Sequence, residues 1–315
     1  MGAWGRRGWE TGHAVAGCAV VTAGLLAWHG AVPNTGVRLG SLLESFLPWL
    51  GVVVVALLCV ALLRRSAVAL VAVMLPVAAW THLFGGLLLP ASAEPGGAGV
   101  VVVQHNVSDE NGDPAGTARV LMDAEPDLIA LQELVPPALT VYEKAFAARY
   151  PYHAVRGTVG LWSRHPLGDA RPLDIRPRGI EGTWQRGLRA LVHTPRGEVA
   201  AYVAHLPSVR VGPRGLASSR RDESARLLGE AVAAERTRSV VLMGDLNGTV
   251  HDRGLAPLTT RLEVAERGLA FSFPASFPLA RIDQVMARSA TVAHIRSLPR
   301  TGSDHLPVAA HLTLR

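Results

Sequence analysis

The 315-residue sequence contains very little cysteine and almost no lysine. Its two cysteines, Cys18 and Cys59, each lie in an apolar run near the N-terminus. The rest of the chain can therefore form neither disulfides nor a thiolate metal site. Lys144 is the only lysine, so arginine carries nearly all of the positive charge. The formal net charge of +6 is mild, and it is compatible with a phosphate-bearing partner without requiring one.

Hydrophobic residues make up 49% of the chain, but they are distributed unevenly. Three apolar runs, roughly 13–32, 46–63 and 67–89, precede residue 91. A membrane-spanning helix needs about 20 mostly apolar residues, so each run is long enough. The sequence thus predicts a transmembrane region over 1–90 with three helices, followed by a Pro/Gly/Ala-rich linker over 91–99. For the first run, a cleaved signal peptide is the alternative, because two arginines precede it.

The arginines flanking these runs predict an orientation, because cytoplasmic loops carry an excess of Arg and Lys. Arg6 and Arg7 precede the first run, and Arg64 and Arg65 fill the turn between the second and third. The loop between the first two runs has only Arg38. We therefore expect a multi-pass cell-membrane protein with a cytoplasmic N-terminus and with everything after residue 89 outside.

From residue 100 onward, short apolar runs alternate with helical patterns, which is typical of a mixed α/β domain. Polar residues repeatedly follow or interrupt the predicted strands. The strands are predicted at 100–104, 127–132, 159–163, 188–193, 199–205, 240–244, 281–287 and 307–314, and the helices at 117–123, 137–149 and 222–235.

The polar residues at these strand ends supply the inventory of a phosphoester-hydrolysing site. A hard cation such as Mg²⁺ prefers oxygen ligands. The reaction also needs a positioned water, a group to orient or deprotonate it, and stabilisation of the phosphoryl charge. Singly, each residue has an ordinary explanation as a turn former, a cap or a helix N-terminal acid, but the ordered set favours a site. Its members are Asn106, Glu133, His205, Asp245, Asn247, Asp283, Asp304 and His305.

Seven motifs in chain order carry a resemblance to a known family. They are QHNV (104–107), LQE (131–133), GLWSRHPL (160–167), AHLPS (204–208), MGDLNGT (243–249), RIDQVM (281–286) and GSDHLPV (302–308). Together they resemble the endonuclease/exonuclease/phosphatase superfamily over residues 100–315. The resemblance implies a four-layered α/β sandwich of the DNase I type, with two mixed sheets packed face to face and helices outside. In this chain three transmembrane helices would precede it.

The resemblance also implies roles for the strand-end residues. Mg²⁺, with Mn²⁺ as an alternative, would be held by Glu133 and Asn106, and Asp304 would complete the metal site or its surroundings. Asp245 would orient or deprotonate the attacking water, while Asn247 would donate a hydrogen bond to the phosphate. His305 would contact the scissile phosphate as the protonated partner of Asp283. His205 matches a histidine found in branches that resemble DNase I and the bacterial sphingomyelinases.

For substrate binding, Arg189 and Arg210 are the best individual candidates among two Arg-rich segments, with solvated loops as the alternative. We expect a nuclease-like phosphodiesterase acting on nucleic acid. The alternatives are a phospholipid or sphingomyelin-type phosphodiesterase, a phosphatase, and a catalytically silent domain that binds a phosphate headgroup or a protein. The sequence shows no sign of an obligate protein partner.

Overall fold

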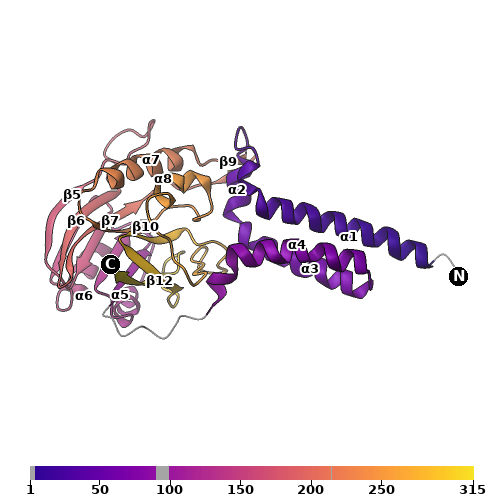
Figure 1. The fold of residues 1–315 in the computed structure, drawn as a ribbon. Coiled ribbons are helices and arrows are strands. Elements are labelled where there is room, and N and C mark those ends of the chain that lie inside the picture. The colour runs from indigo at the N-terminus through magenta and orange to yellow at the C-terminus, as the bar shows by residue number, and fades with distance from the viewer. Residues whose placement is uncertain (1–3, 90–98, 214) are drawn as a thin grey trace. The chain divides into compact units, whose positions relative to one another are not determined.

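The computed structural model describes residues 4–89, 99–213 and 215–315, with side chains described from residue 12 onward. The chain forms two compact units, residues 1–89 and 90–315 (Figure 1). Each unit has its own hydrophobic clusters. Most of the predicted linker, 91–99, lies outside the described residues.

Within the described residues, all regular elements of the N-terminal unit are helices. Small side chains, including Ala19, Ala61 and Ala69, form one of its two clusters, which lets the helices approach closely. Ser66 begins the last long helix, and its hydroxyl accepts a hydrogen bond from the amide of Ala69 at 3.3 Å. The helices are α1 Trp4–Ala27, α2 Leu39–Ser45, α3 Leu50–Leu63 and α4 Ala67–Phe84, with 3₁₀ turns at His29–Ala31, Leu47–Trp49 and Gly85–Leu88.

Among the described residues, one helix, Ala67–Leu88, is by itself long and apolar enough to cross a membrane. A second crossing exists if Leu39–Ser45 and Leu47–Leu63, which meet at a bend of 66°, act as one span. The apolar helix Gly12–Ala27 is shorter. One described helix is therefore long and apolar enough for a span, and the crossing of a membrane by three helices stays a prediction.

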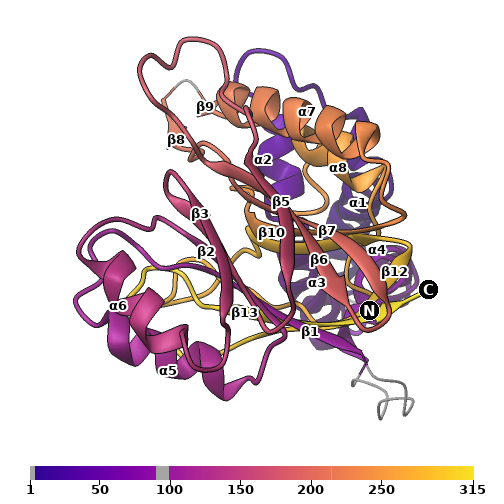
Figure 2. The same ribbon diagram turned by 90° about the vertical axis from the view of Figure 1, so that its left-hand side faces the viewer.

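The second unit contains two large mixed sheets and one small hairpin (Figure 2). The first sheet has the order β12-β13-β1-β2-β4-β3, and the second has the order β11-β10-β7-β6-β5. The strands are β1 Val100–Asn106, β2 Leu128–Gln132, β3 Tyr152–Arg156, β4 Val159–Ser163, β5 Leu167–Pro172, β6 Gly187–Thr194, β7 Gly197–His205, β8 Val211–Gly212, β9 Gly215–Leu216, β10 Ser239–Asp245, β11 Asp283–Arg288, β12 Ala290–Ser297 and β13 Val308–Leu314.

Side chains alternate between the two faces of each strand. One face of each sheet packs into an inner core between the sheets, and the other packs into an outer core beneath the helices. Along β7, Val199, Ala201 and Val203 pack against the other sheet, whereas Ala200 and Tyr202 face the helices. Helices α7 (Ser219–Ala234) and α8 (Ala256–Thr259) cover the second sheet. The first sheet is covered by α5 (Pro114–Asp123) and α6 (Ala138–Phe146). This confirms the α/β sandwich of two mixed sheets with helices on both outer faces.

The strands that the sequence analysis missed, apart from the short hairpin β8–β9, all lie at sheet edges. They are β3, β5 and β12. Strand β5 is mostly exposed or half-buried and carries Gly168, Asp169 and Pro172, which removes the apolar run on which the prediction of a strand depends.

A fully buried arginine on α7 fixes the loop that follows β10. The Arg221 guanidinium donates to the Asn247 carbonyl at 2.9 Å and to the buried carboxylate of Asp252 at 2.5 Å. A Cβ atom at Gly248 would clash with this guanidinium, so a larger residue there would displace Arg221 from these partners. The loop geometry therefore depends on an ion pair that water does not reach.

We expect Arg221→Leu to lower the free energy of unfolding by about 3–5 kcal/mol, because it leaves Asp252 buried without its partner. Urea denaturation of the full chain in detergent, followed by near-UV circular dichroism, would measure the change. Arg226→Leu is the control, because Arg226 pairs with Glu230 on the exposed face of the same helix and should contribute under about 0.5 kcal/mol. Equal effects of the two substitutions would contradict the prediction.

Candidate active site

Strand register places the polar residues of the second sheet in one row. In the parallel pair β7–β10, His205 lies opposite Asp245, and in the antiparallel pair β10–β11, Asp245 lies opposite Asp283. All three side chains share the inner face with Val203, Met243 and Val285. The row therefore lies at the edge of the sandwich and faces the other sheet.

The first sheet brings its own strand ends to the same place. Strands β1 and β2 are parallel, so their carboxyl ends meet at one edge. Asn106, the last residue of β1, donates from Nδ2 to Asp245 Oδ2 at 3.1 Å. Glu133 follows β2 with φ +59, and its Oε1 lies 3.8 Å from His205 Nε2. Both contacts cross from one sheet to the other.

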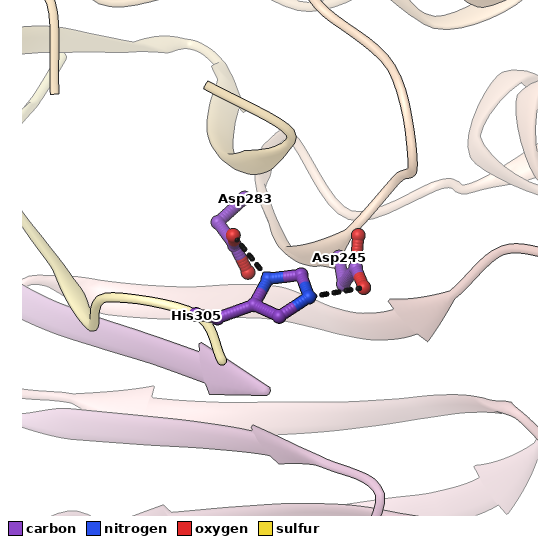
Figure 3. A group of neighbouring side chains, drawn as sticks. All are labelled: Asp245, Asp283 and His305. Atoms are coloured by element: carbon purple, nitrogen blue, oxygen red, sulfur yellow. Dashed lines mark hydrogen bonds and ion pairs between the residues drawn. The ribbon is translucent and has the colours of Figure 1, made fainter. Parts of the chain in front are cut away.

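His305 lies between the two aspartates of the row (Figure 3). Its Nδ1 is 2.7 Å from Asp283 Oδ2, and its Nε2 is 3.8 Å from Asp245 Oδ2. Ser303 holds the backbone of this segment, because its hydroxyl donates to the Asn106 carbonyl at 2.7 Å and accepts from the His305 amide at 3.0 Å. The ring of Phe273 packs against the imidazole with centroids 4.9 Å apart.

Burial and neighbouring charges shift the pKa values of the two aspartates in opposite directions. Burial would raise the pKa of Asp283, but the positive charge of His305 and its hydrogen bond outweigh burial and lower the pKa. Burial would lower the pKa of His305, but Asp283 and Asp245 together raise it to about 10. For Asp245, burial dominates over the attraction of His305 and raises the pKa to about 7. The pair Asp283–His305 is thus charged, and Asp245 titrates near neutral pH.

The second histidine of the site is neutral. His205 is 1% exposed, and burial together with the nearby charge of Arg186 lowers its pKa to about 3. Its Nε2 lies 3.6 Å from Asp245 Oδ2. His205 therefore contributes a neutral ring beside Asp245, in contrast to the charged ring of His305.

Asn247 lies beside the row in a left-handed conformation, with φ +47. Its amide donates to Asp245 Oδ1 at 3.0 Å, and its Nδ2 donates to the Leu206 carbonyl at 2.9 Å. The first of these contacts makes an Asx turn at Asp245, which is the ordinary turn-forming role that such a residue has on its own. It fixes one oxygen of Asp245 and leaves the second hydrogen of the Asn247 side-chain amide free to bind a ligand.

Three predicted site residues lie outside the cluster around Asp245, Asp283 and His305. Asp304 is exposed, because its neighbours Ser303 and His305 take the inward positions of the segment. Arg210 is exposed on the loop after His205. Arg189 lies on the outer face of β6, where it is 5% exposed and pairs with Asp169 at 2.7 Å and with Glu235 at 3.0 Å. The prediction of Arg189 as a substrate ligand is wrong. Alternate residues face opposite sides of a strand, and Arg189 falls on the side away from the site.

The sequence analysis missed Gln104, and it ranked Arg189 above Arg186 within the same Arg-rich segment. Gln104 Nε2 donates to Asp283 Oδ1 at 2.5 Å, and period-two alternation from Asn106 could have placed it on the inner face. Arg186 directly precedes β6, and its Nη1 lies 3.4 Å and 3.5 Å from the two ring nitrogens of His205. It shares the inner-face alternation of Leu188 and Ala190.

The donor atoms at the site fit a hard divalent cation better than a soft one. The side chain of Glu133 is 30% exposed, and Asn106 Oδ1 accepts a hydrogen bond from the Ser108 amide, which leaves its second lone pair for a ligand. Asp245, Asp283 and His305 also offer ligand atoms within 4.8 Å of one another. His305 is protonated and bound to Asp283, so the carboxylate and amide oxygens of Glu133 and Asn106 are the ones that could hold such a cation.

Two face-to-face sheets with carboxylates and histidines at converging strand ends define a class of α/β-sandwich hydrolase folds. Residues 103–305, well over half of the chain, match the model of the endonuclease/exonuclease/phosphatase family. The chain belongs to this family, as its motifs predict. A search of curated proteins finds no match.

Solved structures share the fold at low sequence identity. A family protein from Beutenbergia cavernae DSM 12333 is 21% identical, with a TM-score of 0.56 over 69% of this chain and 72% of that one. TDP2 of D. rerio, complexed with a single-strand DNA product, is 18% identical, with a TM-score of 0.54 over 69% and 100%. Sphingomyelinase C from Streptomyces griseocarneus is 18% identical, with a TM-score of 0.51 over 68% and 99%.

Replacing Asp283 by Asn should lower the pKa of His305 from about 10, because burial, no longer opposed by Asp283, favours the neutral ring. In the wild-type chain the ring keeps its proton through neutral pH and loses it only as the pH approaches 10. Two-dimensional NMR titration of the imidazole in metal-free protein would measure the shift. Asp169→Asn, at an exposed carboxylate, should leave it in place. An unchanged His305 titration in Asp283→Asn would refute the assigned ion pair.

Proposed function

We propose that this chain is a membrane-anchored, Mg²⁺-dependent phosphoester hydrolase, with Mn²⁺ as an alternative cation. The observation that carries the proposal is the position of Asp245, which is buried and has a charged histidine on one side and a neutral one on the other. Family membership supports hydrolysis of phosphoesters in general.

Asp245 is the group that orients and deprotonates the attacking water. Its pKa of about 7 suits a general base at neutral pH. Asn247 and Asn106 each hold one oxygen of the carboxylate, so its direction is fixed before a substrate arrives. A base held in advance loses less entropy in reaching the transition state.

His305 supplies a fixed positive charge where negative charge develops on the phosphoryl oxygens. Asp283 and Gln104 hold this charge in place from the opposite side of the ring. Glu133 and Asn106 would hold the divalent cation, which supplies further neutralisation of the phosphoryl oxygens when bound. Asp304 is exposed beside His305, so it would not be among the residues that bind the cation directly.

For the substrate, we favour a nuclease-like phosphodiesterase acting on nucleic acid. The fold is shared by TDP2 and by sphingomyelinase C, so the fold alone does not choose between nucleic acid and lipid. A lipid phosphodiesterase is the second candidate. It is favoured by Phe277, which is 68% exposed on the loop whose Phe273 packs against His305.

The function can be tested with the full chain in detergent against plasmid DNA, RNA, sphingomyelin, inositol phosphates and bis-p-nitrophenyl phosphate. We expect Mg²⁺-dependent turnover that EDTA removes and added Mg²⁺ restores. Asp245→Asn and His305→Ala should each lower kcat about 100-fold or more, because each removes a group that acts in the transition state. Asp169→Asn is the control on an exposed carboxylate.

Retained activity in both variants would rule out this mechanism. Turnover that EDTA does not affect would rule out the metal. Headgroup binding without turnover of any substrate would instead support the catalytically silent alternative.

We also propose that the second unit lies outside the cytoplasm, anchored by the N-terminal helices. The helix Ala67–Leu88 and the paired arginines Arg64 and Arg65 before it support this orientation. With Cys18 and Cys59 replaced by serine, Arg196→Cys should react with a membrane-impermeant maleimide on intact cells. Arg196 is exposed in the turn between β6 and β7. Labelling that appears only after permeabilisation would place the unit inside.

A further inference from the structure

Arg186 is held at the edge of the active site by the strand pairing itself. Its carbonyl accepts a hydrogen bond from the His205 amide at 2.9 Å, so the two residues lie opposite each other across β6 and β7. The row across the second sheet therefore continues from Asp283 through Asp245 and His205 to Arg186. Adjacent strands are about 4.8 Å apart, which places Arg186 two strands from Asp245.

Two rings hold the guanidinium of Arg186. Its Nη1 is almost equally distant from both ring nitrogens of His205, at 3.4 Å and 3.5 Å. This places Nη1 over the face of the imidazole and not on the lone pair of one nitrogen. Its Cζ lies 5.5 Å from the ring centre of Trp184, within the range of a cation–π contact. Neither ring is charged, so these contacts orient the guanidinium without neutralising it.

The buried arginines of this unit bind other parts of the fold: Arg281 donates to the Gly268 carbonyl at 3.1 Å, and two others pair with carboxylates. Arg189 pairs with Asp169 and Glu235, and Arg221 pairs with Asp222 and Asp252. Among the described residues, no carboxylate lies within ion-pair distance of Arg186. Arg186 is half-buried, so its charge is only partly screened by water. Its positive charge is therefore available to an anion that enters the site.

The position of Arg186 complements that of His305. His305 stands on the β11 side of Asp245, where it pairs with Asp283, whereas Arg186 stands on the β7–β6 side. Its Nη1 is 3.5 Å from His205 Nε2, which is itself 3.6 Å from Asp245 Oδ2. An anion beside Asp245 is therefore within reach of both cations.

We propose that Arg186, oriented by Trp184 and His205, binds a phosphoryl oxygen of the substrate on the side of Asp245 that faces away from His305. The planar guanidinium can donate two parallel hydrogen bonds to a phosphate, which an ammonium cannot do with the same geometry. This inference rests on the proposed function for its substrate, but it concerns the binding of phosphate and can be tested without turnover.

The test compares Arg186→Met and Arg186→Lys with Arg236→Met in the full chain in detergent at constant ionic strength. Arg236 is exposed before β10, at the end of the strand opposite Asp245, so its substitution makes the same charge change away from the site. Calorimetric titration with inorganic phosphate measures binding, and bis-p-nitrophenyl phosphate gives KM and kcat with Mg²⁺.

We expect Arg186→Met to raise the Kd for phosphate and the KM at least tenfold, with a smaller change in kcat. Arg186→Lys should bind phosphate more tightly than Arg186→Met but less tightly than the wild type, because lysine keeps the positive charge but lacks the planar guanidinium with its two parallel donors. Arg236→Met should match the wild-type chain. The backbone hydrogen bond to His205 persists in every variant, and near-UV circular dichroism checks the fold. If Arg186→Met does not fold, a loss of affinity in folded Arg186→Lys carries the test.

A folded Arg186→Met chain with Kd and KM within twofold of the wild type would overturn the proposal. Equal weakening by Arg236→Met would do the same, because it would show an effect of net charge only. A wild-type chain that does not bind phosphate would also overturn it. Phosphate binding that depends on Arg186, in a chain that hydrolyses no substrate, would instead support Arg186 and refute the proposed hydrolysis.

Discussion

The hydrogen-bonded ion pair between Asp283 and His305 is the interaction on which the rest of the site depends. Asp283 begins a strand of the second sheet, whereas His305 lies between two strands of the first. Gln104 of the first sheet donates to the same carboxylate. A buried charge of this kind is tolerated only when its partners satisfy it fully. The pair therefore fixes how the edges of the two sheets meet, and Asn106 and Glu133 then approach Asp245 and His205 across the same boundary.

The same pair gives two chemically identical side chains different roles. Asp283 is stabilised as an anion by His305, while burial dominates at Asp245 and raises its pKa to about 7. The two histidines diverge in the same way, with His305 charged and His205 neutral. Environments that push the pKa values of like groups apart are how one site obtains both a base and a fixed charge. Here the separation follows from where each residue falls along neighbouring strands.

Register also decides which arginine reaches the site. Arg186 and Arg189 are three residues apart at the start of the same strand, so they face opposite sides of the sheet. Arg189 enters an ion-pair network beneath α7, and Arg186 joins the row of His205, Asp245 and Asp283. The number of arginines in this segment does not show which one faces the site. The inward-facing Leu188, Ala190 and Val192 do, because Arg186 shares their alternation and Arg189 does not. The two cations of the site then lie on either side of Asp245.

The sequence by itself determined the apolar N-terminal region, the mixed α/β pattern, and the polar residues at the ends of the inner strands, because these are properties of local composition and period. It identified Asn106, Glu133, His205, Asp245 and His305 through motifs that each occupy a few residues. Only the tertiary structure decided that Asp304 faces outward, that Gln104 holds Asp283, and that the edge strands β3, β5 and β12 exist. Alternation shows which residues share a face of a strand, but it does not show which face meets the other sheet. That choice is made by contacts such as Asn106 to Asp245, between residues far apart in the chain, and no local pattern encodes them.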